Sequence, residues 1–199
     1  MPQGAGKFYF AGETAEKLDD RELNNRDLQV IMLAETLLIF LMLAVLTRSL
    51  KMPLYMVGTI ILSFLAALGL GVFLSDALFG IDEISTRVPL YSFVFLVALG
   101  IDYNIILVSR FMEERNAHSL QKAVELAVAK TGSVISSAGI ILAATFAVLM
   151  TQPVEILFVF GFIMAVGIFI DTFFVRGLLL PALLVWLEKD RKRAEDKSL

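Results

Sequence analysis

Five long apolar segments, separated by short polar connections, constrain the fold of this sequence more than any other feature. They lie at about residues 28–47, 53–74, 88–109, 133–151 and 154–180. A helix of about 20 apolar residues is long enough to cross the hydrocarbon core of a bilayer. The pattern therefore predicts an all-α protein, a polytopic membrane helix bundle of five transmembrane helices within residues 28–187.

The composition agrees with a membrane protein and excludes several other classes. The sequence is 58% hydrophobic and 19% charged, whereas soluble domains average roughly 45–50% and 25%. The absence of cysteine excludes a disulfide framework and cysteine-based metal sites, and the single histidine excludes a histidine-rich metal site. No basic patch with interleaved aromatic residues indicates nucleic-acid binding. We therefore expect no metal and no cofactor, and contacts with membrane lipids.

The segments outside the spans are polar. Residues 1–27 have mixed charge and lack the apolar core of a signal peptide, and residues 188–199 form a charged tail. Between the third and fourth spans, the sequence predicts an amphipathic helix at about 119–131 that lies on the cytoplasmic membrane interface. The last apolar segment continues to Trp186 and exceeds one bilayer thickness, so it must tilt, kink near Pro181 or run along the interface.

The distribution of Lys and Arg predicts the orientation, because short cytoplasmic loops carry an excess of positive residues. These residues are frequent in the first and third connections and in the C-terminal tail. The second connection has Arg87 alone, and the fourth has none. We therefore predict a multi-pass protein of the cell membrane, with an extracytoplasmic N-terminus and a cytoplasmic C-terminus.

Asp102 interrupts the third apolar segment at a depth where a carboxylate is costly. At about 1.5 Å per residue from Val88, it lies about 21 Å below the outer surface. A charge in hydrocarbon costs a few kcal/mol or more, so ionisable residues in spans are candidates for proton or ion pathways. The alternative is a structural acid bonded to a neighbouring hydroxyl. Tyr103, beside Asp102, is as consistent with an ordinary packing aromatic as with a functional residue.

Two other spans place polar side chains in the same layer. Asp171 lies about 24 Å down the fifth span, and Ser136 and Ser137 lie about 5–6 Å from the cytoplasmic end of the fourth. The serines can instead bond a carbonyl one turn back, and Asp171 is as consistent with structure as with function. Pairing of Asp171 with Arg176 is disfavoured by the i,i+5 spacing. We therefore expect Arg176 to extend to the cytoplasmic edge.

A carboxylate in this layer can exchange a proton near physiological pH. The apolar surroundings favour its neutral form, whereas hydroxyl donors from Tyr103 or Ser137 favour its ionised form. If protonation changes the preferred packing of the helices, proton flow can drive a conformational cycle.

The residues around Asp102 resemble a known motif. Gly100–Glu114 contains an Asp-Tyr pair, a Ser-Arg pair and two acidic residues, and is similar to the Asp-Tyr motif of MmpL-type transporters of the resistance-nodulation-division (RND) superfamily. Ser136–Gly139 resembles the start of the next helix in that family, and residues 167–183 resemble the last helix of a half. Residues 10–15 resemble the end of the family's extracytoplasmic porter domain. The resemblance covers essentially the whole chain.

The resemblance implies proton-coupled export of lipids, lipid-linked precursors or amphiphilic drugs. It implies that Asp102 and Tyr103 form the proton relay, with Ser137 or Ser136 as a nearby hydroxyl and Asp171 at a family position of open role. Family members have two halves, each with one span, a porter domain and five further spans. This sequence matches the last five spans of one half, without the first helix and the porter domain. We therefore expect it to act with the missing N-terminal half and porter domain, or with another copy of itself, and to be inactive alone.

Two other hypotheses stay open at this point. A lipid-responsive or scaffolding five-span module of the sterol-sensing type would not need Asp102 to titrate, and an inert remnant would fold without activity. We do not expect an enzyme, because the sequence contains no nucleophile–base pair, metal cluster or phosphate-binding glycine loop.

Overall fold

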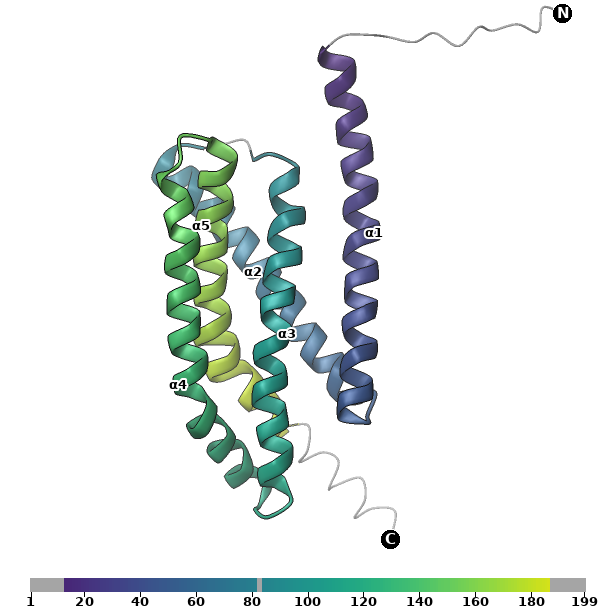
Figure 1. The fold of residues 1–199 in the computed structure, drawn as a ribbon, viewed down its shortest axis with the longest axis vertical. Helices are drawn as coiled ribbons and strands as arrows, with labels where there is room; N and C mark the ends of the chain where they lie inside the picture. Colours follow the sequence, from purple (N-terminus) through teal and green to yellow (C-terminus); the bar gives the residue numbers. More distant parts are fainter. Residues whose placement is uncertain (1–12, 82–83, 187–199) are drawn as a thin grey trace, which may run out of the picture.

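The computed structural model describes residues 13–81 and 84–186, which form long helices and no strand (Figure 1). The main helices are α1 (Glu13–Thr47), α2 (Lys51–Phe79), α3 (Arg87–Arg115), α4 (Leu120–Ala147) and α5 (Glu155–Ile170). A short 3-10 helix, η1 (Val148–Thr151), follows α4, and a π-helical segment, η2 (Asp171–Leu179), continues α5. Five helical stretches are long and apolar enough to cross a membrane, which confirms the predicted fold class.

The surface of the bundle is apolar, as a lipid-facing surface must be. Large side chains such as Leu33, Val45 and Phe73 are exposed on the outside of α1 and α2. Contiguous exposed apolar surface of this kind marks contact with a membrane or a partner. Helices suit that environment because they satisfy their backbone hydrogen bonds internally.

The helices pack unequally. In Figure 1, α1 stands at one edge of the bundle, where it contacts α2 and α3, while α3, α4 and α5 lie close together and α2 crosses them obliquely. The main core contains the fully buried side chains of Leu43, Met56, Phe93 and Met164, which come from α1, α2, α3 and α5. This core holds α1 to the bundle and fixes the position of α3.

The start of α4 differs from the expectation of a separate amphipathic helix. One continuous helix runs from Leu120 to Ala147, with no break at Gly132. Ala123, Val124 and Ala127 are buried in a cluster that includes Leu107 and Phe111 of α3. The apolar face of this segment therefore packs on protein, so that the helix continues into the span instead of ending at the interface.

An ion pair reinforces this contact between α3 and α4. Glu114, near the end of α3, is buried, and its Oε1 accepts a hydrogen bond of 2.6 Å from Lys130 Nζ. Arg110 Nη2 lies 2.7 Å from the same oxygen. The first turns of α4 are thus tied to the end of α3 by charge as well as by apolar packing.

The last apolar segment is helical from Glu155 to Trp186, and its geometry changes at η2. A proline inside a helix removes a backbone donor, and its ring clashes with the carbonyl four residues earlier. Pro181 comes shortly after the end of η2, at Leu179. The carbonyl four residues before this proline is that of Gly177, which lies within η2. Widened π turns are one way in which helices accommodate such a disturbance.

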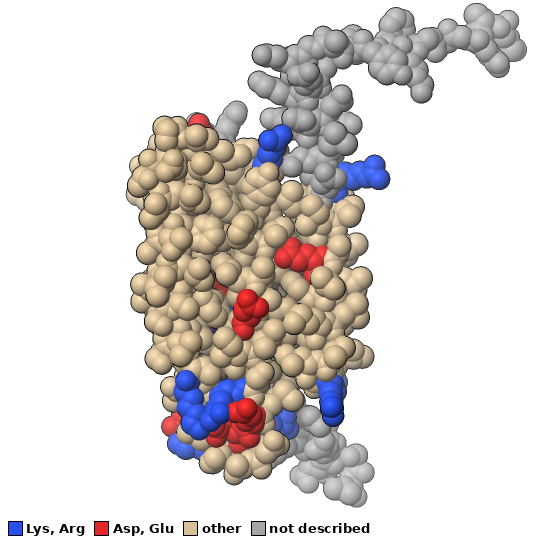
Figure 2. Space-filling model, viewed as in Figure 1, with Lys and Arg blue, Asp and Glu red and all other residues tan. Residues whose placement is uncertain are grey.

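Charged side chains are separated from the apolar belt. Figure 2 shows Lys and Arg at the two ends of the bundle and a tan middle zone in which only isolated acidic side chains appear. The end that carries Arg110, Lys122 and Lys130 is called the charged end below. The arrangement is the one expected when the ends lie in water and the middle lies in lipid.

We predict that the contact between α5 and the turn after α4 has no room for a methyl group. A Cβ at Gly161 would lie 2.6 Å from the carbonyl oxygen of Phe146 and 2.7 Å from Leu149 Cβ. Gly161→Ala should therefore destabilise the protein by about 1–3 kcal/mol through overpacking. The measurement is thermal unfolding in detergent.

Gly58→Ala is the matched control, because a Cβ there meets nothing within 4 Å. It should leave stability unchanged or raise it slightly, since alanine favours helix more than glycine does. Equal unfolding temperatures for the two variants would contradict the packing described here.

Candidate functional site

A buried ion pair lies where η2 meets α3. Arg176 Nε donates a hydrogen bond of 2.7 Å to Asp171 Oδ2, and Arg176 Nη2 donates to the same oxygen. Arg176 Nη2 also donates to the carbonyl oxygen of Gly100 on α3, at 2.8 Å. The side chains of Arg176 and Asp171 are only 2% and 10% exposed. The pair therefore neutralises two charges, and the hydrogen bond from Arg176 to Gly100 links the fifth span to the third.

The sequence-based expectation for Arg176 was wrong. We expected it to extend to the membrane edge because i,i+5 spacing is poor in an α-helix. Residues 171–179 are instead π-helical, and a π-helix bonds residue i to i+5. Its wider turn brings Asp171 and Arg176 onto one face, so the arginine points inward and pairs.

Tyr103 completes this buried group from the α3 side. The guanidinium carbon of Arg176 lies 4.8 Å from the centroid of the Tyr103 ring. A cation over an aromatic face at this distance is stabilised by about 0.5–2 kcal/mol. Tyr103 therefore has a defined contact with the ion pair, beyond ordinary packing.

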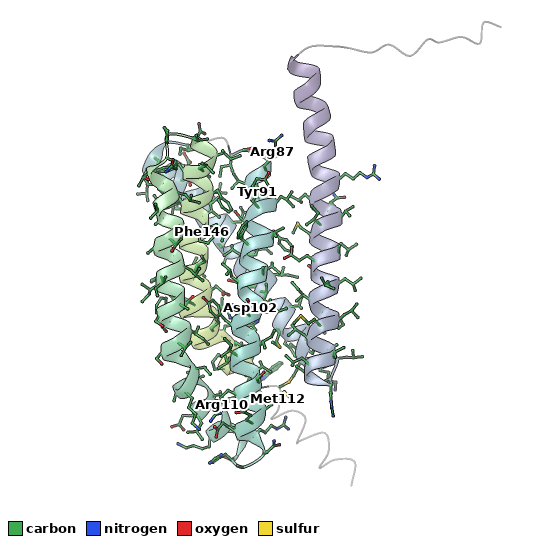
Figure 3. All side chains as sticks on the ribbon, in the orientation of Figure 1. Arg87, Tyr91, Asp102, Arg110, Met112 and Phe146 are labelled. Atoms are coloured by element: carbon green, nitrogen blue, oxygen red, sulfur yellow. The ribbon has the colours of Figure 1, made fainter. Side chains whose placement is uncertain are left out.

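Asp102 lies on the opposite side of α3 from the core, exposed on the surface of the five-helix unit. Figure 3 places it about halfway along α3, and Figure 2 shows an isolated acidic patch at the same place in the apolar zone. Tyr91, Phe95 and Ile106 are exposed on the same helix, at intervals that continue this face. The exposed face of α3 therefore combines large apolar side chains with one carboxylate.

The two serines have different positions. Ser137 is exposed, and its hydroxyl donates to the carbonyl oxygen of Val134 at 3.1 Å, one turn back. Ser136 is partly buried and lines a small cavity together with Thr172 and Arg176. Of the predicted site residues, the structure thus brings Tyr103 and Asp171 together around Arg176, with Ser136 nearby, while Asp102 and Ser137 lie on the outer surface.

Three contributors were missed by sequence reasoning. Arg176, Thr172 and the carbonyl of Gly100 belong to the buried group. The sequence does contain a signal for Arg176, because an arginine within an apolar segment should face protein unless it can reach water. We expected Arg176 to reach water at the membrane edge, and therefore did not include it among the site residues.

A close approach of α4 to η2 holds Thr172 in place. A Cβ at Gly139 would lie 2.6 Å from Thr172 Cγ2, so only glycine fits at that position of α4. Small residues allow helix backbones to approach in this way within membranes. Gly139 thereby determines how near α4 lies to the buried ion pair.

Among the side chains that the structure describes, no group of three or more His, Cys, Asp or Glu could hold a metal ion. The buried group and Asp102 together offer two carboxylates, a guanidinium, a phenol and hydroxyls. The carboxylates can exchange protons, and the guanidinium can donate charge-assisted hydrogen bonds.

Five apolar spans, a buried ion pair and a carboxylate in the apolar zone define a polytopic α-helical membrane protein with ionisable groups in its spans. The chain belongs to the MMPL family, whose model matches residues 2–198. The resemblance noted around Asp102 is thus confirmed at the level of the family.

Three relatives illustrate the similarity. The chain is 53% identical over 174 residues to SCO5905 of Streptomyces coelicolor, named as a membrane protein, covering 87% of this chain and 20% of that protein. It is 45% identical over 181 residues to the apo-petrobactin exporter of Bacillus anthracis, covering 91% and 24%. It is 38% identical over 174 residues to the probable transport protein MmpL12 of Mycobacterium tuberculosis, covering 87% and 15%. The chain spans about a fifth of the length of these relatives.

We predict that breaking the ion pair on one side destabilises the bundle strongly. Arg176→Met leaves the Asp171 carboxylate buried without its partner, and uncompensated buried charge costs about 3–5 kcal/mol. The measurement is again thermal unfolding in detergent, compared with the unaltered chain.

The double variant Asp171→Asn with Arg176→Met is the control, because it removes both charges. It should recover part of the lost stability, since replacing both members of a buried pair is often nearly neutral. An Arg176→Met variant as stable as the unaltered chain would contradict the structural role of the pair.

Proposed function

We propose that this chain is the C-terminal membrane part of a proton-motive-force-driven exporter of lipids or amphiphilic compounds, with Asp102 and Tyr103 as its proton relay. The observation that carries the proposal is the position of Asp102, a carboxylate on an exposed face halfway along a span. The family and the names of the relatives support transport. The proton, the class of substrate and the relay residues are our inference.

The exposed position of Asp102 argues for a partner surface. A carboxylate that faces lipid costs a few kcal/mol or more, and the exposed face of α3 offers it no partner of its own. We infer that another helical surface covers this face in the working transporter. The N-terminal half of such a transporter, with its porter domain, is our first candidate, and a second copy of this chain is the alternative.

Tyr103 can couple Asp102 to the rest of the bundle. The two residues are adjacent on α3, and the Tyr103 ring lies under the guanidinium of Arg176, which binds Asp171. A change of charge at Asp102 would therefore be felt by a buried electrostatic network that joins α3 to η2. Such a network can favour one helix arrangement when Asp102 is protonated and another when it is ionised.

Ser136, Ser137 and Asp171 take supporting roles in this proposal. Asp171 holds Arg176 against α3, and Ser136 lies on the cavity beside that arginine. Ser137 is on the outer surface, so it would act only when a partner covers α4. The proposed orientation places the charged end, with Lys122 and Lys130, in the cytoplasm.

The test is Asp102→Asn in the assembled transporter, followed by export driven by an imposed proton gradient. Asparagine keeps the shape of the side chain and cannot exchange the proton, so we expect proton-driven export to fall to background. Glu125→Gln is the control, because its ion pair with Lys122 is exposed and such pairs contribute little.

Export at the normal rate in the Asp102→Asn protein would rule out the proposed relay. Unchanged binding of a partner in Asp102→Asn, with no export by either protein, would instead favour a lipid-responsive or scaffolding module without transport activity.

A further inference from the structure

A small cavity lies between α3, α4 and η2, beside the buried ion pair. Its volume is about 40 Å³, and its polar lining consists of Thr131, Ser136, Thr172 and Arg176. Leu107 and Ile135 contribute apolar lining. A cavity needs roughly 10–15 Å³ to hold a water molecule, so this one has room for at least one.

Two buried polar atoms of the lining residues have no protein partner among the residues that the structure describes. They are Arg176 Nη1 and Thr172 Oγ1. The other donors of Arg176 are used, because Nε and Nη2 bind Asp171 and Nη2 also binds the carbonyl of Gly100. Leaving a buried donor without an acceptor costs about 1–3 kcal/mol, so an acceptor in the cavity would be stabilised.

The charge and the size of the cavity select the occupant. Asp171 already balances the charge of Arg176, so the cavity does not favour an anion. Water can accept a hydrogen bond from Arg176 Nη1 and can also bond the hydroxyl of Thr172. A purely apolar occupant would leave both polar atoms unsatisfied.

The cavity extends from the ion pair toward the charged end of the bundle. Thr131, on its lining, is adjacent to Lys130, whose side chain is 47% exposed and bonds Glu114 at that end. Ser136 lies five residues deeper on α4, closer to the middle of the apolar zone. The lining therefore runs from the buried Arg176 to Thr131, the neighbour in sequence of Lys130 at the charged end.

We propose that this cavity is a hydration site, in which one or more water molecules bond Arg176 Nη1 and Thr172 Oγ1. The presence of water rests only on the cavity and its lining.

The chain contains no cysteine, so a single introduced thiol can report on water without background. Thiols react as thiolates, which form only where water can reach them. We would measure the reaction of Ser136→Cys with 2-aminoethyl methanethiosulfonate, using the full chain in lipid vesicles. Ser63→Cys is the control, because Ser63 is buried on α2 and does not line the cavity. We expect Ser136→Cys to react at least about tenfold faster.

A second substitution tests whether the water depends on the polar lining. Thr172→Val keeps the shape and removes the hydroxyl, so it should slow the reaction of Ser136→Cys by about tenfold. Thr145→Val is the matched control, because its exposed hydroxyl bonds Ile141 within α4, away from the cavity. It should leave the rate unchanged.

A reaction of Ser136→Cys no faster than that of Ser63→Cys would overturn the proposal, as would an unchanged rate with Thr172→Val. If Ser136→Cys does not fold, Thr131→Cys reports on the same cavity with the same two outcomes expected. The labelling needs no proton gradient and no export. An unreactive thiol at position 136 would therefore refute the hydration site without bearing on the proposed relay at Asp102. Failure of the relay in the export experiment would not change the labelling result.

Discussion

The pairing of Arg176 with Asp171 is the interaction on which the middle of this bundle depends. An arginine within apolar spans must find an opposite charge, and here the π-helical turn of η2 brings the partner onto the same face. The same guanidinium bonds the carbonyl of Gly100 and lies over Tyr103, so one side chain fixes η2 against α3. Gly139 then lets α4 approach the same point. Three spans are thus positioned around one neutralised charge pair.

This arrangement explains why Asp102 and Tyr103, adjacent in sequence, have different environments. Successive residues of a helix point about 100° apart, given 3.6 residues per turn. Tyr103 therefore contacts the ion pair, while Asp102 is on the exposed face. The proposed relay would therefore combine a buried network with a carboxylate that another helical surface must cover.

Sequence reasoning predicted the fold well because membrane spans are defined by length and hydropathy, which are local properties. The five segments and the all-α class follow from them directly. It also predicted Asp102, Tyr103 and Asp171 as site residues, because ionisable or polar groups stand out in apolar segments, and the structure places Tyr103 and Asp171 around Arg176 and Asp102 on the exposed face of α3. It missed the pairing of Arg176, because that depends on a π-helical turn that the standard i,i+4 rule does not contain. It also divided α4 in two, because the burial of Ala123 and Ala127 against α3 is a tertiary contact that a sequence periodicity cannot reveal.

The proposed function requires Asp102 to gain and lose a proton during transport. The most direct measurement is infrared difference spectroscopy of the assembled transporter in membranes, recorded across a pH jump, in the region where protonated carboxyl groups absorb. We expect a carboxyl band that is present in the unaltered protein, absent from Asp102→Asn and retained in Glu125→Gln. The same carboxyl band in the unaltered and Asp102→Asn proteins would show that Asp102 does not exchange the proton.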